Sequence, residues 1–305
     1  MGSSSPSSSR RDEAIGGLLV GTASLLFGAV IIFGRYALAE GITVSSMLAM
    51  RYAVGALLLT VVLALTRRPL LAARGERVAL EVLAVFGYAV ESAFFFVAVG
   101  HGTVAAVTLL FFTYPVFVTA GTWLVGRGAP ARITLVALAC AVGGSAIVVA
   151  TGGGLAIEAA GVVFALASAV TYSGYLIGAD FALKRTNPMT GAMWVSAGAS
   201  VGLFAYALAL GEWVGPHGWS GWWPILGMGA ASAAAFVCLL DGLQRLGAVR
   251  TAIVAATEPL SSAFLAWVFL GESVSLGTVA GGALILAGAV TASLARATPQ
   301  EQQIP

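Results

Sequence analysis

The chain has 305 residues, of which 59% are hydrophobic and only 9% are charged, and its mean hydropathy is +0.96. Soluble globular proteins carry about 25% charged residues, so this composition excludes a soluble fold. The formal net charge of +2 excludes a nucleic-acid-binding protein, because binding to phosphate backbones needs clustered positive charge.

Ten apolar stretches follow one another along the chain, each close to the roughly 20 residues that a membrane-spanning helix needs. The polar segments 1–13 and 296–305 at the two ends are expected to be disordered cytoplasmic tails. The sequence therefore predicts an all-α polytopic membrane protein with ten transmembrane helices and no separate soluble domain. The predicted spans are 14–36, 45–65, 78–98, 103–125, 132–150, 157–181, 187–210, 222–241, 248–270 and 275–295.

Basic residues divide unevenly between the two sides of such a bundle. With the N-terminus inside, 13 of the 15 Lys and Arg residues fall in cytoplasmic segments, and only Arg35 and Arg51 lie toward the other side. Cytoplasmic loops of membrane proteins carry an excess of positive charge. We therefore expect both termini to lie in the cytoplasm. The expected location of the chain is the bacterial inner (plasma) membrane. Arg51 is expected to pair with an acid at the outer rim or to extend toward the headgroups.

The two halves of the chain are weakly similar to each other at a shift of 144 or 145 residues. Each half, 14–150 and 157–295, contains five predicted helices, so the second half must enter the membrane in the opposite sense. Inverted repeats of this kind are typical of secondary transporters, which bind substrate near the midplane between the repeats. A gene duplication without a transport role is the alternative. The aligned pairs include Gly17 with Gly161, Ser24 with Ser168, Pro115 with Pro259, and Trp123 with Trp267.

Two stretches resemble a known family. The segment EPLSSAFLAWVFLGESVSLGTVAGGALILAGAV at 258–290 and RYAVGALLL at 51–59, in a layout of five plus five helices, resemble the EamA-like members of the drug/metabolite transporter (DMT) superfamily. Among these, the resemblance is to amino-acid exporters of the YddG type. The first half departs from the pattern, because Tyr114-Pro115 replaces Glu-Pro. The resemblance implies export of small metabolites from the cell.

Two acidic residues lie within predicted spans, Glu91 in the third and Glu258 in the ninth. A carboxyl group inside a membrane is energetically costly, so each marks a candidate functional site. For both residues, a purely structural carboxyl is the alternative. Either acid offers a route for proton coupling, whereas a passive facilitator needs neither.

Pro115 and Pro259 occupy corresponding places in the fourth and ninth spans. Proline removes a helix hydrogen bond and leaves the carbonyl four residues earlier without its partner, here the carbonyls of Phe111 and Ala255. Broken helices at matching positions of two repeats point to a transport site, and a kink that serves only packing is the alternative. We expect both prolines to bend their helices toward one shared cavity.

Aromatic and hydroxyl side chains share helix faces with the acids. Tyr88 and Phe95 flank Glu91 at spacings of three and four residues, which places all three on one face, and the sixth span repeats this arrangement. Core packing or lipid contact is the alternative for each aromatic residue. The residues expected to bind substrate around one central cavity are Phe27, Tyr88, Glu91, Phe95, Tyr114, Ser168, Tyr172, Tyr175 and Glu258.

The sequence lacks the motifs of several other functional classes. It has no Walker loop, no cluster with metal-ligand spacing, and no Ser-His-acid set that could meet within the membrane. We therefore expect neither an enzyme nor a cofactor-dependent or metal-binding protein. The expected function is alternating-access export of small amphipathic metabolites, chiefly amino acids including aromatic ones. The partners would be a small-molecule substrate and the lipid bilayer, and the sequence leaves monomer or homodimer undecided.

Two other functions remain open at this point. An exporter of aromatic organic cations is the first alternative, because aromatic rings and a carboxylate suit a cation. A membrane scaffold that transports nothing is the more distant one.

Overall fold

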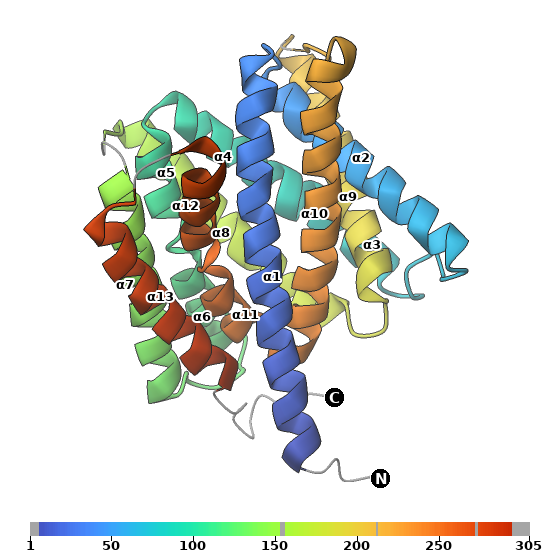
Figure 1. The fold of residues 1–305 in the computed structure, drawn as a ribbon. Coiled ribbons are helices and arrows are strands. Elements are labelled where there is room, and N and C mark those ends of the chain that lie inside the picture. Colours follow the sequence, from blue (N-terminus) through green and yellow to red (C-terminus); the bar gives the residue numbers. More distant parts are fainter. Residues whose placement is uncertain (1–5, 153–155, 212, 272–273, 295–305) are drawn as a thin grey trace.

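The computed structural model describes residues 6–152, 156–211, 213–271 and 274–294. Its regular elements are helices, and strand pairing among the described residues is limited to one bridge between Gly102 and Ile157. Nine helical segments of the described chain are long and apolar enough to cross a membrane, and a tenth apolar helix, Leu276–Ala292, is slightly shorter. The chain is therefore an all-helical, multi-pass membrane protein, drawn in Figure 1.

The helices follow the predicted spans in chain order. Three spans are composite: a π-helical segment interrupts the third, and short breaks divide the fourth and the ninth. The elements are α1 (Pro6–Ala39), α2 (Val44–Leu65), α3 (Arg77–Val82), the π-helix η1 (Leu83–Ala89), α4 (Val90–Gly100), α5 (Val104–Phe111), α6 (Tyr114–Leu124), α7 (Arg132–Gly152), α8 (Ala159–Ala182), α9 (Pro188–Ala209), α10 (Gly218–Leu246), α11 (Ala248–Ala255), α12 (Glu258–Leu270) and α13 (Leu276–Leu294).

Helix α1 begins earlier than the sequence predicts. It starts at Pro6, inside the segment 1–13 expected to be a disordered tail. Two ion pairs explain the difference: a carboxylate oxygen of Glu13 lies 3.2 Å from Nη1 of Arg250, and one of Asp12 lies 3.2 Å from Nη1 of Arg245. These contacts hold the first turns of α1 against α10 and α11. Residues 1–5 and the predicted tail 296–305 lie outside the described residues.

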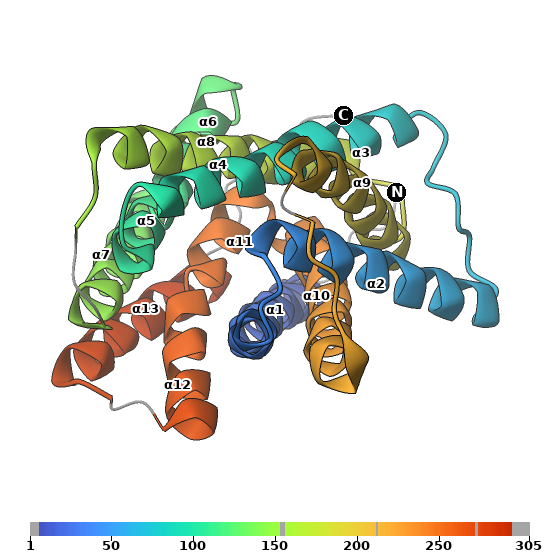
Figure 2. The same cartoon turned by 90° about the horizontal axis from the view of Figure 1, so that it is seen from above.

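Helices from distant parts of the sequence pack in pairs. Helix α1 lies along α10, α7 along α13, α2 along α9, and α4 along α8, as the view in Figure 2 makes clear. Glycine permits the closest of these contacts. A Cβ atom at Gly144 would lie 2.5 Å from the carbonyl oxygen of Gly281, and one at Gly288 would lie 2.7 Å from that of Ala137. Helices α7 and α13 therefore meet backbone to backbone.

The fourth and ninth spans break at equivalent places. Helix α6 begins at Tyr114 and α12 at Glu258, and in each the next residue is proline. Proline is well placed in the first turn of a helix, where its missing N–H has no intrahelical partner to lose. At the second break, the hydroxyl of Ser24 donates to the carbonyl of Ala255 at 3.3 Å. A polar side chain thus compensates a backbone acceptor inside the bundle.

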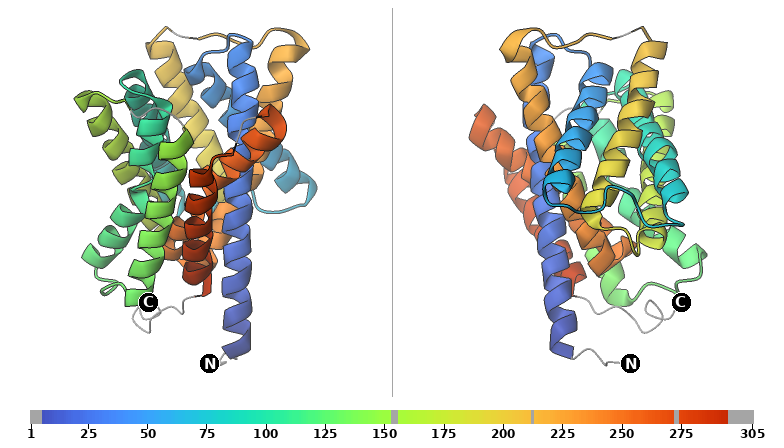
Figure 3. Two further views of the ribbon diagram at one scale, coloured as in Figure 1. Left: turned by 60° about the vertical axis from the view of Figure 1, so that its left-hand side comes forward. Right: turned by 90° about the vertical axis from the view of Figure 1, so that its right-hand side faces the viewer.

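Polar contacts tie together the loops at the end where α1 begins and α13 ends, here called the termini end (Figure 3). The Glu76 carboxylate accepts hydrogen bonds from the Thr186 hydroxyl at 2.5 Å and from the backbone N–H groups of Arg185 and Thr186. The Gln244 side chain donates to the carbonyl oxygens of Leu183 and Thr186. At the opposite end, Nδ1 of His101 lies 3.0 Å from a carboxylate oxygen of Glu158.

Candidate functional site

The candidate site is built around Tyr88, near the end of the π-helix η1. The centre of its ring lies 5.0 Å from that of Phe236, 5.4 Å from Tyr175, 5.5 Å from Tyr52 and 6.2 Å from Tyr172. All four contacts have the edge-to-face geometry that aromatic pairs favour. Tyr88 thereby joins five helical elements of the bundle, namely η1, α2, α8 and α10 directly and, through Tyr172, α6.

Further aromatic contacts extend from Tyr172. Its ring centre lies 4.9 Å from that of Tyr114 and 5.5 Å from that of Phe111. Two more contacts, each with ring centres 5.5 Å apart, are Phe95 with Phe111 and Phe27 with Phe236. The structure thus brings all six predicted aromatic residues into one continuous set of ring contacts. We call this set the aromatic cluster: Phe27, Tyr52, Tyr88, Phe95, Phe111, Tyr114, Tyr172, Tyr175 and Phe236.

Glu91 lies at the start of α4, almost one turn beyond Tyr88, and is 5% exposed. Each of its carboxylate oxygens accepts a hydroxyl hydrogen bond, one from Ser168 at 3.0 Å and the other from Ser92 at 3.1 Å. Ser168 is the hydroxyl residue that the sequence places in the site. Because Ser168 belongs to α8, Glu91 also links the third and sixth spans.

Glu258 is the first residue of α12, directly at the break in the ninth span. It is partly exposed, and no hydrogen bond to its carboxylate is found among the described residues. It interacts electrostatically with Glu91, Tyr114 and Tyr172. The two predicted acids therefore share one region with the aromatic cluster.

Arg51 is placed differently from the sequence-based expectation of an outer rim position. Its guanidinium group donates to the Tyr52 hydroxyl and lies 4.3 Å from the centre of the Tyr52 ring. It also interacts electrostatically with both Glu91 and Glu258. Arg51 turns inward because α2 lies against both α9 and α10. Gly55, one turn later, allows the close approach, since a Cβ there would lie 3.3 Å from the Gly229 carbonyl oxygen.

Sequence reasoning missed four residues of this region: Arg51, Tyr52, Phe111 and Phe236. Arg51 and Tyr52 are the first two residues of the RYAVGALLL stretch. The resemblance of that stretch to the transporter family is the sequence feature that points to them. Tyr52 is completely buried, and its pairing with Tyr88 is a contact between two different spans. Phe236 on α10 offered no signal that sets it apart from the other apolar residues of its helix.

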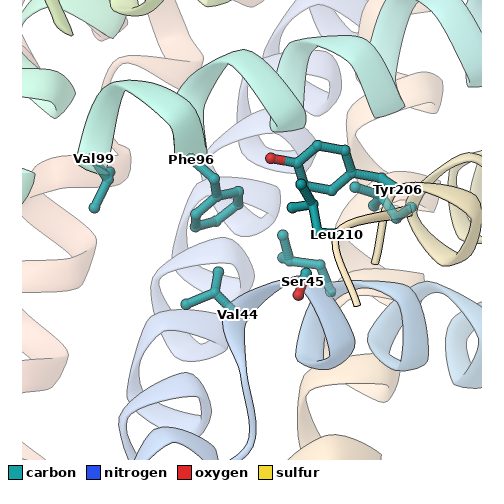
Figure 4. Close-up of a pocket in the computed structure, with 8 residues that line it drawn as sticks. Val44, Ser45, Phe96, Val99, Tyr206 and Leu210 are labelled. Atoms are coloured by element: carbon teal, nitrogen blue, oxygen red, sulfur yellow. The ribbon is translucent and has the colours of Figure 1, made fainter. Parts of the chain in front are cut away.

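A pocket of about 210 Å³ lies beside the aromatic cluster, toward the end opposite the termini end. Figure 4 shows Val44 and Phe96 reaching into it from α2 and α4, with Tyr206 beside Leu210. None of the residues predicted from the sequence lines this pocket; their rings pack against one another deeper in the bundle. The lining residues are Val44, Ser45, Leu48, Phe96, Val99, Leu203, Tyr206 and Leu210.

Known proteins resemble this chain in sequence and in fold. A family model described as the EamA-like transporter family matches residues 14–150 and again residues 159–294. An uncharacterized transporter of Archaeoglobus fulgidus is 28% identical over 211 residues, covering 69% of this chain and 74% of the relative. An uncharacterized transporter of Synechocystis is 27% identical over 173 residues, covering 54% of this chain and 51% of the relative.

A solved structure described only as the crystal structure of a protein has the same fold. It superposes with a TM-score of 0.78 at 20% identity, covering 91% of this chain and 97% of the other.

Proposed function

Since the chain belongs to the EamA-like transporter family of the DMT superfamily, we propose that it exports small amphipathic metabolites, chiefly amino acids including aromatic ones. One observation carries this proposal: two carboxylates and an arginine lie beside the aromatic cluster, next to breaks in two membrane-spanning helices. Such charged groups are costly in a membrane and are retained where they serve transport.

The chemistry of the site suits an amino acid. Stacked and edge-on rings accommodate an aromatic side chain, while Glu91 and Glu258 offer partners for an ammonium group. Among the cluster's neighbours, Arg51 supplies the positive charge that a carboxylate requires. The same two acids are the groups through which we propose that transport is coupled to protons.

We infer that the bundle consists of two inverted five-helix repeats, 14–150 and 157–295. The family model matches the chain twice, which supports a duplication. Each residue has a counterpart in the other half 144 positions away. When Gly144 and Gly281 are replaced by their counterparts, Gly288 and Ala137, the result is the second close contact of the same helix pair. The same exchange of halves turns the α1–α10 pair into the α8–α4 pair, and both pairs are packed.

We propose that the chain lies in a bacterial inner membrane with both termini on the cytoplasmic side. This orientation rests on the basic residues of the segments at the termini end and on the positive-inside rule. The pocket then lies toward the outside, whereas Glu76 and Gln244 tie the cytoplasmic loops together. This arrangement matches one end state of an alternating-access cycle, in which groups of helices rock around a midplane site.

Export of aromatic organic cations is the second candidate. One observation favours it: two carboxylates lie near a single arginine, and aromatic rings attract cations through their π faces.

Counterflow in proteoliposomes separates these functions. Purified protein is reconstituted into vesicles preloaded with phenylalanine, alanine or tetraphenylphosphonium, and exchange of the corresponding radiolabelled solute is measured against empty liposomes. We expect exchange of phenylalanine above that of the cation. Exchange of the cation alone would favour the second candidate, and no exchange of any of these solutes would contradict the proposed amino-acid export.

A further inference from the structure

We propose that Arg51 binds the carboxylate of the substrate and Glu258 its ammonium group, so that the site selects zwitterionic amino acids over amines and carboxylic acids of the same shape. This inference rests on the proposed function and names the groups that set its substrate class.

The first argument concerns the hydrogen bonds of Arg51. A guanidinium group has five N–H donors and no acceptor, and in this structure Arg51 donates to the Tyr52 hydroxyl. Its Nε atom is buried and has no hydrogen-bonding partner among the residues that the structure describes. A buried donor without a partner is unfavourable, and a planar guanidinium is well shaped to bind a carboxylate through paired hydrogen bonds. A substrate carboxylate would supply the missing acceptor.

The second argument concerns the two acids. Both oxygens of Glu91 already accept hydrogen bonds, from Ser168 and Ser92. Glu258, in contrast, is partly exposed, and no hydrogen bond to its carboxylate is found in the described part of the chain. Glu258 is therefore the acid whose acceptor sites are all open to an ammonium group, whereas Glu91 keeps only its remaining lone pairs. Glu91 is bound to helix α8 through Ser168 and positions that helix.

The third argument is one of charge balance. Arg51 lies over the Tyr52 ring, and ring contacts lead from Tyr52 through Tyr88 and Tyr172 to Tyr114. The Tyr114 hydroxyl donates to the carbonyl of Ala252 in α11, the helix that ends at the break before Glu258. The aromatic cluster therefore has one positive and one negative group beside it to present to a ligand. A zwitterion matches both groups. An amine would leave Arg51 without a counter-charge from the ligand, and a carboxylic acid would do the same to Glu258. A partly buried charge without a partner is unfavourable, and such mismatches are a source of specificity.

The fourth argument is access from the pocket. Leu48 lines the pocket on α2, and Arg51 and Tyr52 follow it by three and four residues, which is about one helical turn of 5.4 Å. A ligand that moves inward from the pocket along α2 therefore reaches Arg51 and the Tyr52 ring together, about one turn beyond Leu48. Its carboxylate would bind at Arg51 while its side chain lies against that ring.

The test compares three ligands with the same ring and a two-carbon chain: phenylalanine, phenethylamine and 3-phenylpropionate. Each is titrated as a competitor of radiolabelled phenylalanine counterflow, and direct binding to the purified protein is measured in parallel. We expect wild-type protein to bind phenylalanine about tenfold or more tightly than either analogue, since a site built to pair a polar group rejects the analogue that lacks it.

Substitutions assign this selectivity to the two residues. Arg51→Gln should weaken phenylalanine binding about tenfold, which is about 1.4 kcal/mol, and leave phenethylamine unchanged or tighter. Glu258→Gln should weaken phenylalanine and phenethylamine but spare 3-phenylpropionate. Arg35→Gln, on the exposed surface of α1, is the matched control and should change none of the three.

Each result supports or overturns the inference. If a monodisperse Arg51→Gln protein loses phenylalanine and phenethylamine equally, or loses neither, Arg51 does not bind the carboxylate. If that variant does not fold, Arg51→Lys replaces it. The lysine keeps the charge without the guanidinium fork, so it should weaken phenylalanine binding and leave phenethylamine binding unchanged. Equal weakening of both ligands overturns the inference. Wild-type exchange of phenylalanine without discrimination against either analogue overturns this inference but not the proposed function, whereas absence of phenylalanine exchange overturns the proposed function.

Discussion

Tyr88 is the residue that joins most of the rings in the site, so its removal should alter substrate preference. Edge-to-face aromatic contacts contribute about 0.5–1.5 kcal/mol each. We expect Tyr88→Ala to lower exchange of phenylalanine several-fold more than exchange of alanine, because only the aromatic substrate uses the ring wall. Counterflow of the two amino acids measures this. Tyr36→Ala, on an α1 tyrosine that is 39% exposed, is the control, and equal loss of both substrates would assign Tyr88 to packing alone.

Glu91 provides a separate test of proton coupling. Glutamine at this position keeps oxygen and nitrogen atoms that can bond to Ser168 and Ser92 but cannot take up a proton. We therefore expect Glu91→Gln to remove the pH dependence of net uptake while counterflow, which needs no net proton movement, continues. Uptake driven by an imposed pH gradient is the measurement. Glu258→Gln is measured beside it at saturating substrate, and wild-type pH dependence in both variants would show that neither acid carries the coupled proton.

Spacing along the helices is enough to group most of the site residues. The intervals between Tyr88, Glu91 and Phe95 place them on one face, and the costs of burying a carboxyl turn that face inward. Spacing does not predict the position of Arg51. The hydropathy of the span is the same whether an arginine seven residues into it points to the membrane rim or into the bundle. Only the packing of α2 between α9 and α10 directs it toward the acids.

The loop before α3 is held to the loop before α9 by Glu76, and this contact should depend on pH. Burial by itself raises the pKa of the Glu76 carboxyl, but hydrogen bonds from the Thr186 hydroxyl and from the N–H groups of Arg185 and Thr186 outweigh it and lower the pKa below its ordinary value. Because the pKa of Glu76 is lower in the folded state than in the unfolded chain, its ionised carboxylate stabilises the fold at pH values above the unfolded pKa. This stabilisation is lost as the pH falls through the folded value.

We accordingly expect Glu76→Gln to lower the free energy of unfolding by about 2 kcal/mol at pH 7, the usual contribution of hydrogen bonds to a charged group. The difference from wild type should shrink below about pH 4, where an ordinary glutamate is protonated. Thermal unfolding in detergent across this pH range is the measurement. Glu81→Gln, on the exposed side of α3, is the control, and a difference that persists unchanged at pH 3 would contradict the assignment.

At the level of helices, the sequence predicts the order of the spans well and their details less well. Apolar stretches of about 20 residues are a strong signal, and the proline positions mark both broken spans. The start of α1 was misjudged because Glu13 has its partner, Arg250, on the ninth span, far along the chain. The π-helix Leu83–Ala89 has no local signal, since its residues are equally compatible with an α-helix.

For the whole molecule, the proposed orientation predicts which loops face the cytoplasm. Single cysteines at Ala129, between α6 and α7, and at His217, before α10, lie at opposite ends of the bundle and are exposed. The native residues Cys140 and Cys238 are free and are first replaced by alanine. A membrane-impermeant maleimide added to intact cells should label position 217 and leave position 129 unlabelled. The reverse pattern would invert the orientation, and labelling of both from one side would contradict the helix count.

The backbone contact between α7 and α13 has a consequence for how such a bundle can move. If the two halves are inverted copies, the inward-open and outward-open forms differ by an exchange of roles between them. That exchange maps the α7–α13 pair onto itself, because the Gly144–Gly281 contact and the Gly288–Ala137 contact simply trade places. This pair can keep the same geometry in both forms and act as a stationary pivot. The pairs that the exchange does not preserve, α1 with α10 and α4 with α8, must then carry the opening and closing.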